Sequence, residues 1–154
     1  MSRLNRRRSR GQAMVEFALI APIFFLILFG IVDMARYVYT LNTLQQVARE
    51  SARVGSVPIR PTECSTSSRV SCVKTIAINR AIAVGLTGSD ITVTCEHVED
   101  DGTISNVTDI DGECAATDML VVKIQTNFTL VTPLISQYIN KVGLSGEARM
   151  TVNQ

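Results

Sequence analysis

The sequence predicts an α+β protein with a long N-terminal helix, a second helix and a three- to four-stranded antiparallel sheet. Three observations carry this prediction. Residues 17–32 are uncharged and mostly apolar, a helical stripe of apolar residues continues toward Gly55, and apolar and polar residues alternate in the C-terminal half. At 154 residues, the chain is long enough for one globular domain beside a membrane segment. We therefore expect four parts: a basic leader peptide at 1–11, a transmembrane helix at 12–33, an amphipathic extension at 34–57, and an extracytoplasmic α+β domain with two disulfides at 58–154.

The apolar run has the length of a membrane-spanning helix. A hydrocarbon core of ~30 Å needs ~20 helical residues, and residues 13–32 contain a single charge, Glu16. Five arginines precede Gly11, and such a cluster is expected to stay on the cytoplasmic side. A buried core helix of a soluble protein would not need these arginines. A cleaved secretory signal would need small residues after the run, where Asp33 and Met34 stand.

The helix is expected to continue beyond the membrane. After Asp33, apolar residues recur at three- and four-residue spacing, which indicates an amphipathic helix: Val38, Leu41, Leu44, Ala48 and Ala52. No break occurs before Gly55, and Pro58 and Pro61 then end the pattern. Pro22 inside the apolar run is expected to kink the helix or loosen one turn, because proline lacks the N–H donor.

The remaining elements follow from periodicity and turn residues. Residues 70–85 predict a second helix, and residues 86–90 predict a turn. Alternation from Ile91 predicts a strand, with a hairpin turn at Asp101-Gly102 and a short return strand at 103–108. We expect a longer strand at 119–131, a short helix at 133–141 and a final strand at 147–152.

Four cysteines follow the apolar helix: Cys64, Cys72, Cys95 and Cys114. An even number on the extracytoplasmic side predicts two disulfides in an oxidising compartment. Of the three possible connectivities we favour Cys64–Cys72 with Cys95–Cys114, because both close local loops. A zinc site is the alternative, but no cysteine pair has C-x-x-C spacing and His97 is the sole histidine.

Few residues carry reactive chemistry. Nothing in the sequence places a nucleophile beside His97, and no phosphate-binding glycine loop is present, so we expect neither an enzyme nor a cofactor. Residues 96–118 hold eight acids and no lysine or arginine. Asp109, Asp111 and Glu113 alternate like the start of a calcium loop, but the twelfth position of an EF-hand would be Leu120. A looser calcium site therefore stays an alternative to a solvated acidic loop.

The charge balance depends on the leader. The whole chain has 15 Lys+Arg and 14 Asp+Glu, and residues 1–11 carry five arginines and no acid. Without them, 10 basic residues face 14 acidic residues, a net charge of −4. Because the basic run adjoins a membrane helix and has no interleaved aromatic residues, membrane topology explains it without a nucleic-acid partner.

The residues around the leader resemble a known processing site. One stretch resembles the prepilin peptidase site of Flp-type and Tad-type pilins: Gly11, followed by QAMV and then by Glu16-Phe17. Residues 9–55 as a whole resemble the TadE-like family of minor pseudopilins, which belong to the bacterial tight-adherence (Tad) pilus system, and the C-terminal LSGEARMTV does so to a lesser extent.

That resemblance implies a pilin-like shape and a set of roles. Prepilin peptidase would cut between Gly11 and Gln12, and Glu16 would pair with the new α-amino group of a neighbouring subunit. The expected partners are prepilin peptidase, other pilins or pseudopilins, and inner-membrane lipid. The chain would be a single-pass bacterial inner-membrane protein with a cytoplasmic N-terminus and a periplasmic or extracellular domain, acting in pilus assembly or initiation. The alternative is an uncleaved single-pass membrane protein whose outer domain binds a partner.

Overall fold

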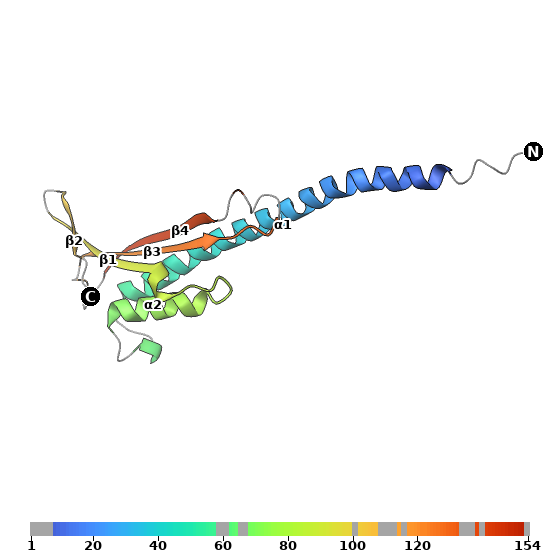
Figure 1. Ribbon diagram of the computed structural model, residues 1–154. Helices are drawn as coiled ribbons and strands as arrows, with labels where there is room; N and C mark the ends of the chain where they lie inside the picture. Colours follow the sequence, from blue (N-terminus) through green and yellow to red (C-terminus); the bar gives the residue numbers. More distant parts are fainter. Residues whose placement is uncertain are drawn as a thin grey trace, which may run out of the picture. The chain divides into compact units, whose positions relative to one another are not determined.

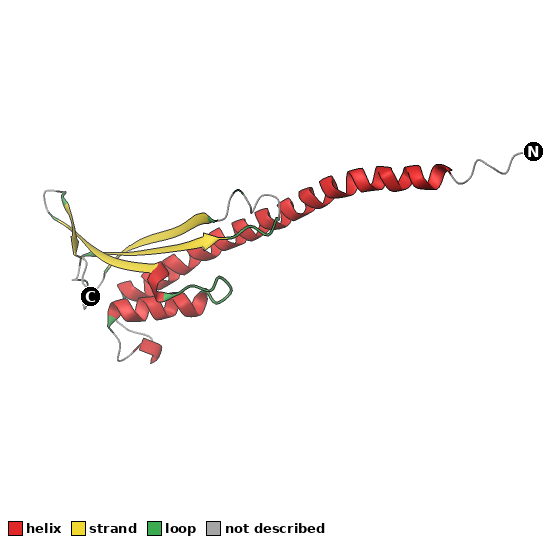
Figure 2. Cartoon of the chain, in the orientation of Figure 1, coloured by secondary structure: helices red, strands yellow, loops and turns green. Residues whose placement is uncertain are grey.

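The computed structural model describes residues 8–57, 62–64, 68–99, 102–107, 114, 117–132, 138 and 141–152. The helical elements are α1 (Arg8–Ser56), the 3₁₀ turn η1 (Thr62–Cys64), α2 (Arg69–Arg80) and the 3₁₀ turn η2 (Gly88–Asp90). The strands are β1 (Ile91–Val98), β2 (Ile104–Val107), β3 (Met119–Phe128) and β4 (Val142–Thr151). Figures 1 and 2 show these helices and strands, which confirm the predicted α+β class.

The chain divides into two compact units. The first, here called the helical unit, comprises Met1–Tyr37 and Thr129–Lys141. The second, the sheet unit, comprises Val38–Phe128 and Val142–Gln154. Helix α1 therefore contributes residues to both units, and each unit is described by itself below.

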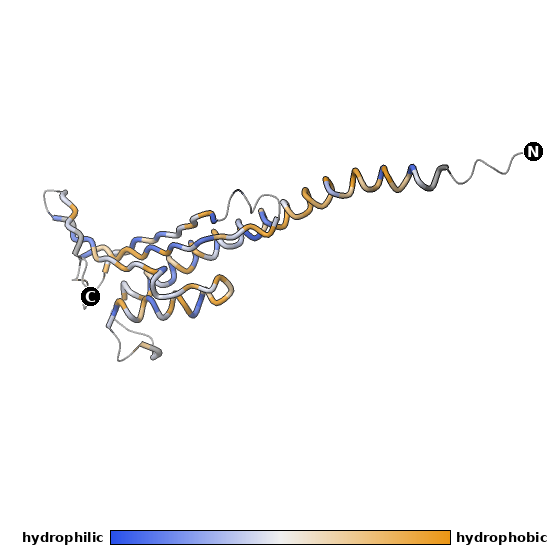
Figure 3. The backbone as a smooth tube through the Cα atoms, in the orientation of Figure 1, coloured by the Kyte–Doolittle hydropathy of each residue, from blue (hydrophilic) through white to orange (hydrophobic). Residues whose placement is uncertain are grey.

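In the helical unit, α1 exposes its apolar side chains. Phe17, Ile20 and Ile23 are each more than 60% exposed, and hydrophobic residues dominate this part of the chain in Figure 3. Pro22 lies inside the helix, which continues through it. Within the described residues one helix, over Gly11–Ser56, is long and apolar enough to cross a membrane by length and composition. Exposure of so many large apolar side chains to water would be unfavourable, which is consistent with lipid or neighbouring helices as their surroundings.

In the sheet unit, the predicted apolar stripe of α1 becomes the core. Leu44, Ala48 and Ala52 are fully buried, whereas Val38 at the start of the stripe is 43% exposed. The helix ends at Ser56, close to the predicted end at Gly55. Arg69 of α2 holds this end, because its Nη1 donates a 2.6 Å hydrogen bond to the carbonyl oxygen of Gly55.

The sheet is antiparallel with the strand order β2-β1-β3-β4. In β3, the apolar residues Leu120, Val122, Ile124 and Phe128 are all buried, but Val121 is buried as well, so burial alternates only after Val122. Two glycines permit close packing on α1. A Cβ atom at Gly146 of β4 would lie 2.7 Å from the carbonyl carbon and oxygen of Leu44, and one at Gly55 would lie 2.7 Å from Cγ2 of Val73.

Three predicted boundaries were wrong. Helix α2 ends at Arg80 instead of residue 85, because residues 81–85 form a turn that closes with Gly85 at φ 71°. Strand β3 ends at Phe128 instead of residue 131. Strand β4 begins at Val142 instead of Glu147, because Gly143 and Gly146 interrupt the apolar alternation that marks a strand. The helix predicted at 133–141 lies mostly outside the described residues.

Candidate functional site

The proposed processing residues lie near the start of α1. Gly11, Gln12 and Glu16 are all helical and exposed in this structure. Glu16 follows Gly11 by five residues, or ~7.5 Å along a helix at ~1.5 Å per residue. Residues 1–7 of the predicted leader lie outside the described part of the chain. The roles of Gly11, Gln12 and Glu16 stay predictions.

A buried carboxylate in the helical unit was not singled out from the sequence. Asp33, 5% exposed, accepts hydrogen bonds from the backbone N–H of Val131 at 3.0 and 3.1 Å and of Thr132 at 2.9 Å. The Thr132 hydroxyl donates a further bond of 2.6 Å to the same carboxylate. Nη1 of Arg36 lies 3.6 Å away and supplies a partial counter-charge. Asp33 thus fastens the segment after β3 to α1, and the available sequence signal was its position as the first acid after the apolar run.

The structure joins Cys64 to Cys72 and Cys95 to Cys114, the two pairs that their local spacing favoured. The Cα atoms are 5.3 Å apart in the first pair and 5.6 Å apart in the second. Cys64 and Cys72 pack with Ile76 in a small buried cluster, so this disulfide attaches η1 to α2. All four cysteines are buried.

His97, near the end of β1, pairs with an acid. Its Nδ1 lies 2.6 Å from Oδ1 of Asp118, whose side chain is almost fully buried. Asp118 also anchors the end of the sheet, because its carbonyl oxygen accepts a hydrogen bond from the N–H of Val152 at 2.8 Å. The His97–Asp118 contact therefore joins the end of β1 to the residue that precedes β3.

The metal candidates could not be located. Asp109, Asp111 and Glu113 lie outside the described residues, so the calcium alternative is untested. Within the residues that are described, no group of three or more His, Cys, Asp or Glu side chains is placed to hold a metal ion.

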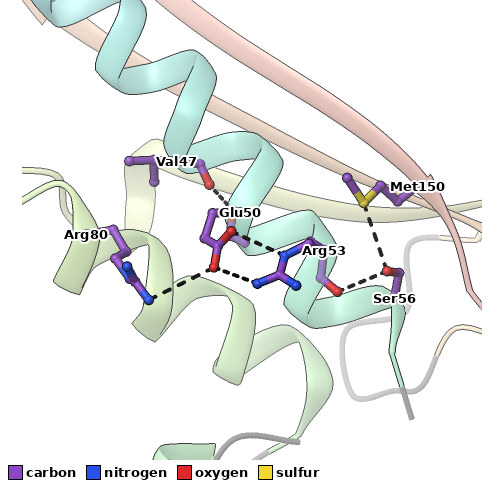
Figure 4. Close-up of polar contacts among 7 residues, drawn as sticks. Val47, Glu50, Arg53, Ser56, Arg80 and Met150 are labelled. Atoms are coloured by element: carbon purple, nitrogen blue, oxygen red, sulfur yellow. Dashed lines mark hydrogen bonds and ion pairs between the residues drawn. The ribbon is translucent and has the colours of Figure 1, made fainter. Parts of the chain in front are cut away.

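A charged groove lies on the sheet unit, where α1, α2 and β4 meet. Its cavity volume is about 700 Å³, and its walls include Tyr39, Arg49 and Arg53 from α1, Arg80 from α2 and Met150 from β4. Glu50 also lines the groove, and Figure 4 shows its carboxylate between Arg53 and Arg80. It accepts two hydrogen bonds from Arg53, at 3.3 and 3.1 Å, and approaches Nη2 of Arg80 at 4.0 Å. The hydrogen bonds from Arg53 hold the pKa of the Glu50 carboxyl below its usual value.

Comparison with known proteins agrees with the resemblance read from the sequence. No curated protein and no solved structure matches the chain. A family model described as TadE-like protein matches residues 11–53, less than a third of the 154 residues. The matched stretch covers the exposed apolar part of α1 and most of its buried continuation in the sheet unit. Residues 11–53 are therefore similar to the TadE-like family of pilus components, and the long apolar helix that contains them is of the kind that anchors proteins in membranes.

Proposed function

We propose that this chain is a minor pseudopilin of a Tad/Flp pilus, processed by prepilin peptidase and active in pilus assembly or initiation. The observation that carries the proposal is the overlap between the TadE-like match, residues 11–53, and the part of α1 that is long and apolar enough to cross a membrane, Gly11–Ser56. The helix would hold the subunit in the inner membrane and later pack against other pilin helices. The proposed orientation has the arginine leader in the cytoplasm and the sheet unit in the periplasm or outside the cell.

Processing is proposed between Gly11 and Gln12. Exposure of this bond is consistent with access by a peptidase, although α1 begins before it, at Arg8, so cleavage would require local opening of the first helical turns. Such opening is inexpensive at a helix terminus, where the first N–H groups have no partner within the helix.

Mass spectrometry of the membrane-extracted protein tests this step. The expected N-terminus is Gln12 in cells with an active prepilin peptidase. Gly11→Lys should leave the full-length form, whereas Ser9→Lys should be cleaved as the wild type is. A wild-type chain that keeps its leader in such cells would favour the alternative, an uncleaved single-pass membrane protein with an extracytoplasmic binding domain.

Glu16 is proposed to act in assembly. A carboxylate at mid-bilayer costs ~2.5–3.5 kcal/mol on insertion scales, and less near the interface. Pairing with the new α-amino group of Gln12 on a neighbouring subunit would offset this cost only when the two helices are in the correct axial register. A favourable charge near the helix N-terminus, worth ~0.3–1 kcal/mol, is the alternative role.

The two roles of Glu16 separate experimentally. Glu16→Ala should leave membrane insertion and leader cleavage intact but reduce co-purification with other pilins and the number of pili. Glu147→Ala, which removes an exposed acid from β4, is the matched control and should assemble normally. Normal assembly of Glu16→Ala would leave Glu16 only the helix-end role.

A further inference from the structure

The groove on the sheet unit carries an excess of positive charge. Three arginines, Arg49, Arg53 and Arg80, line it together with one acid, Glu50. Among the described residues, no carboxylate lies within ion-pair distance of Arg49. The side chains of Arg53 and Arg80 are 64% and 65% exposed although both approach Glu50. The groove therefore presents a net charge of about +2 with guanidinium donors still available, since each guanidinium has five N–H groups.

The groove has the character of a peptide site. Tyr39 and Met150 add apolar surface to its walls, and a second depression of about 260 Å³ shares Glu50, Arg53 and Arg80 with it. Glu50 would repel a compact, doubly charged ion such as phosphate. An extended segment with separate single carboxylates can place each acid beside Arg49 or Arg80 and avoid Glu50. Arginine binds carboxylates well, because its planar fork matches their two oxygens.

The chain itself contains a segment of complementary charge. Residues 98–113 include six acids and no lysine, arginine or histidine: Glu99, Asp100, Asp101, Asp109, Asp111 and Glu113. We propose that the arginine groove of one copy binds the acidic segment 98–113 of a second copy of this chain. Groove and segment consist of different residues, so the contact is head-to-tail and leaves one groove and one acidic segment unused in each pair. The proposal is independent of leader cleavage.

A peptide titration tests the groove directly. A fluorescent peptide of residues 98–113 is titrated with the full-length protein in detergent micelles at about 50 mM salt, where surface charges are weakly screened. We expect saturable binding that weakens as salt is added, and none for a peptide with its six acids replaced by amides. Arg49→Glu with Arg80→Glu should weaken binding about tenfold or more. Lys123→Glu with Lys141→Glu, two exposed lysines outside the groove, is the matched control and should bind as the wild type does.

A second groove variant keeps the result decisive. Arg49→Gln with Arg80→Gln removes the charges without introducing acids, and it should weaken binding by a smaller factor while the circular dichroism spectrum stays unchanged. Equal affinity of the wild type and both groove variants, or no saturable binding, would overturn the proposal. So would loss of phosphatidylglycerol retention in the groove variants without any peptide binding, which would assign the groove to lipid.

Mixing experiments test the head-to-tail geometry. Neither Arg49→Glu/Arg80→Glu nor Asp109→Lys/Asp111→Lys should self-associate, as measured by light scattering in micelles. Mixed together, they should form pairs, because the first variant keeps an acidic segment and the second keeps an intact groove. The pairs should not grow further, since the remaining groove and segment are both disabled. No pairing in the mixture, or association of the wild type that is independent of concentration, would contradict a contact between two copies.

Discussion

Asp33 is buried, and the residues that contact its carboxylate all belong to the helical unit. Its carboxylate accepts hydrogen bonds from two backbone N–H groups and the Thr132 hydroxyl. Among the residues that the structure describes, these donors have no other acceptor, so removing the carboxylate should cost more than a typical surface substitution. Leaving a buried donor unsatisfied costs ~1–3 kcal/mol.

Asp33→Ala is therefore expected to lower the free energy of unfolding by about 1–3 kcal/mol. The loss should be accompanied by faster amide exchange at Val131 and Thr132, measured by hydrogen–deuterium exchange in micelles. Asp33→Asn keeps one carbonyl acceptor and should lose less. Unchanged exchange at both amides in Asp33→Ala would show that another group holds this segment.

Glu50 should give stability a pH dependence. Arg53 holds the pKa of the folded Glu50 carboxyl below 4.5, its usual value. A lowered pKa means that the folded state binds the proton less tightly than the unfolded state does. The contribution is thus fully present above pH 4.5 and is lost as the pH falls through the folded pKa.

Glu50→Gln is expected to be less stable than the wild type at pH 7, by under about 1 kcal/mol because the pair is partly exposed. The difference should shrink toward zero as the pH falls below 4.5 and through the lowered pKa of the folded Glu50 carboxyl, as followed by thermal unfolding at several pH values. Glu99→Gln, at an exposed acid outside the groove, should show a smaller difference at pH 7. A difference for Glu50→Gln that does not change with pH would contradict the ion-pair explanation.

At the scale of elements, the packing of β4 on α1 depends on Gly146, which has no side chain. A Cβ atom at Gly146 would meet the backbone of Leu44, which cannot move without displacing the helix. A Cβ atom at Gly143, in the same strand, would meet nothing within 4 Å. The two glycines form a matched pair that differs mainly in this close approach.

Gly146→Ala is expected to destabilise the sheet unit by ~1–3 kcal/mol, since the added methyl group overpacks the helix–strand contact. Gly143→Ala should be neutral or slightly stabilising, because it mainly reduces the entropy of the unfolded chain. Denaturant titration of both variants in micelles makes the comparison. Equal effects would mean that β4 and α1 separate easily at this point.

At the scale of the whole molecule, the disulfides test the proposed orientation across the membrane. Bonds of this type persist on the oxidising side of the membrane and are reduced in the cytosol. Non-reducing peptide mapping should recover Cys64 with Cys72 and Cys95 with Cys114. Removing the first pair as Cys64→Ser/Cys72→Ser should lower the free energy of unfolding by ~2–4 kcal/mol. Free thiols in freshly isolated protein would contradict the proposed orientation.

Long periodic segments were predictable from the sequence, whereas their ends were less so. The apolar run and the stripe at Leu44, Ala48 and Ala52 are repeated signals that many residues share, so α1 was expected to within one residue of its end. The predicted β4 began five residues too late, at Glu147 instead of Val142, because Gly143 and Gly146 weaken the alternation of apolar and polar residues. Gly146 is small because α1 lies against it, and the sequence alone does not reveal such a contact.

The same contrast holds for the candidate sites. The exposed apolar helix, the TadE-like segment and the local cysteine pairs rest on residues near one another in the chain, so periodicity, motif and spacing were enough to predict them. The hydrogen bonds of Asp33 connect it to Val131 and Thr132, which lie 98 and 99 positions further along the chain. The arginine groove combines residues from α1, α2 and β4. Only the tertiary structure could bring these groups together, because hydrogen bonds and charges act over a few ångströms in space, whatever their separation along the chain.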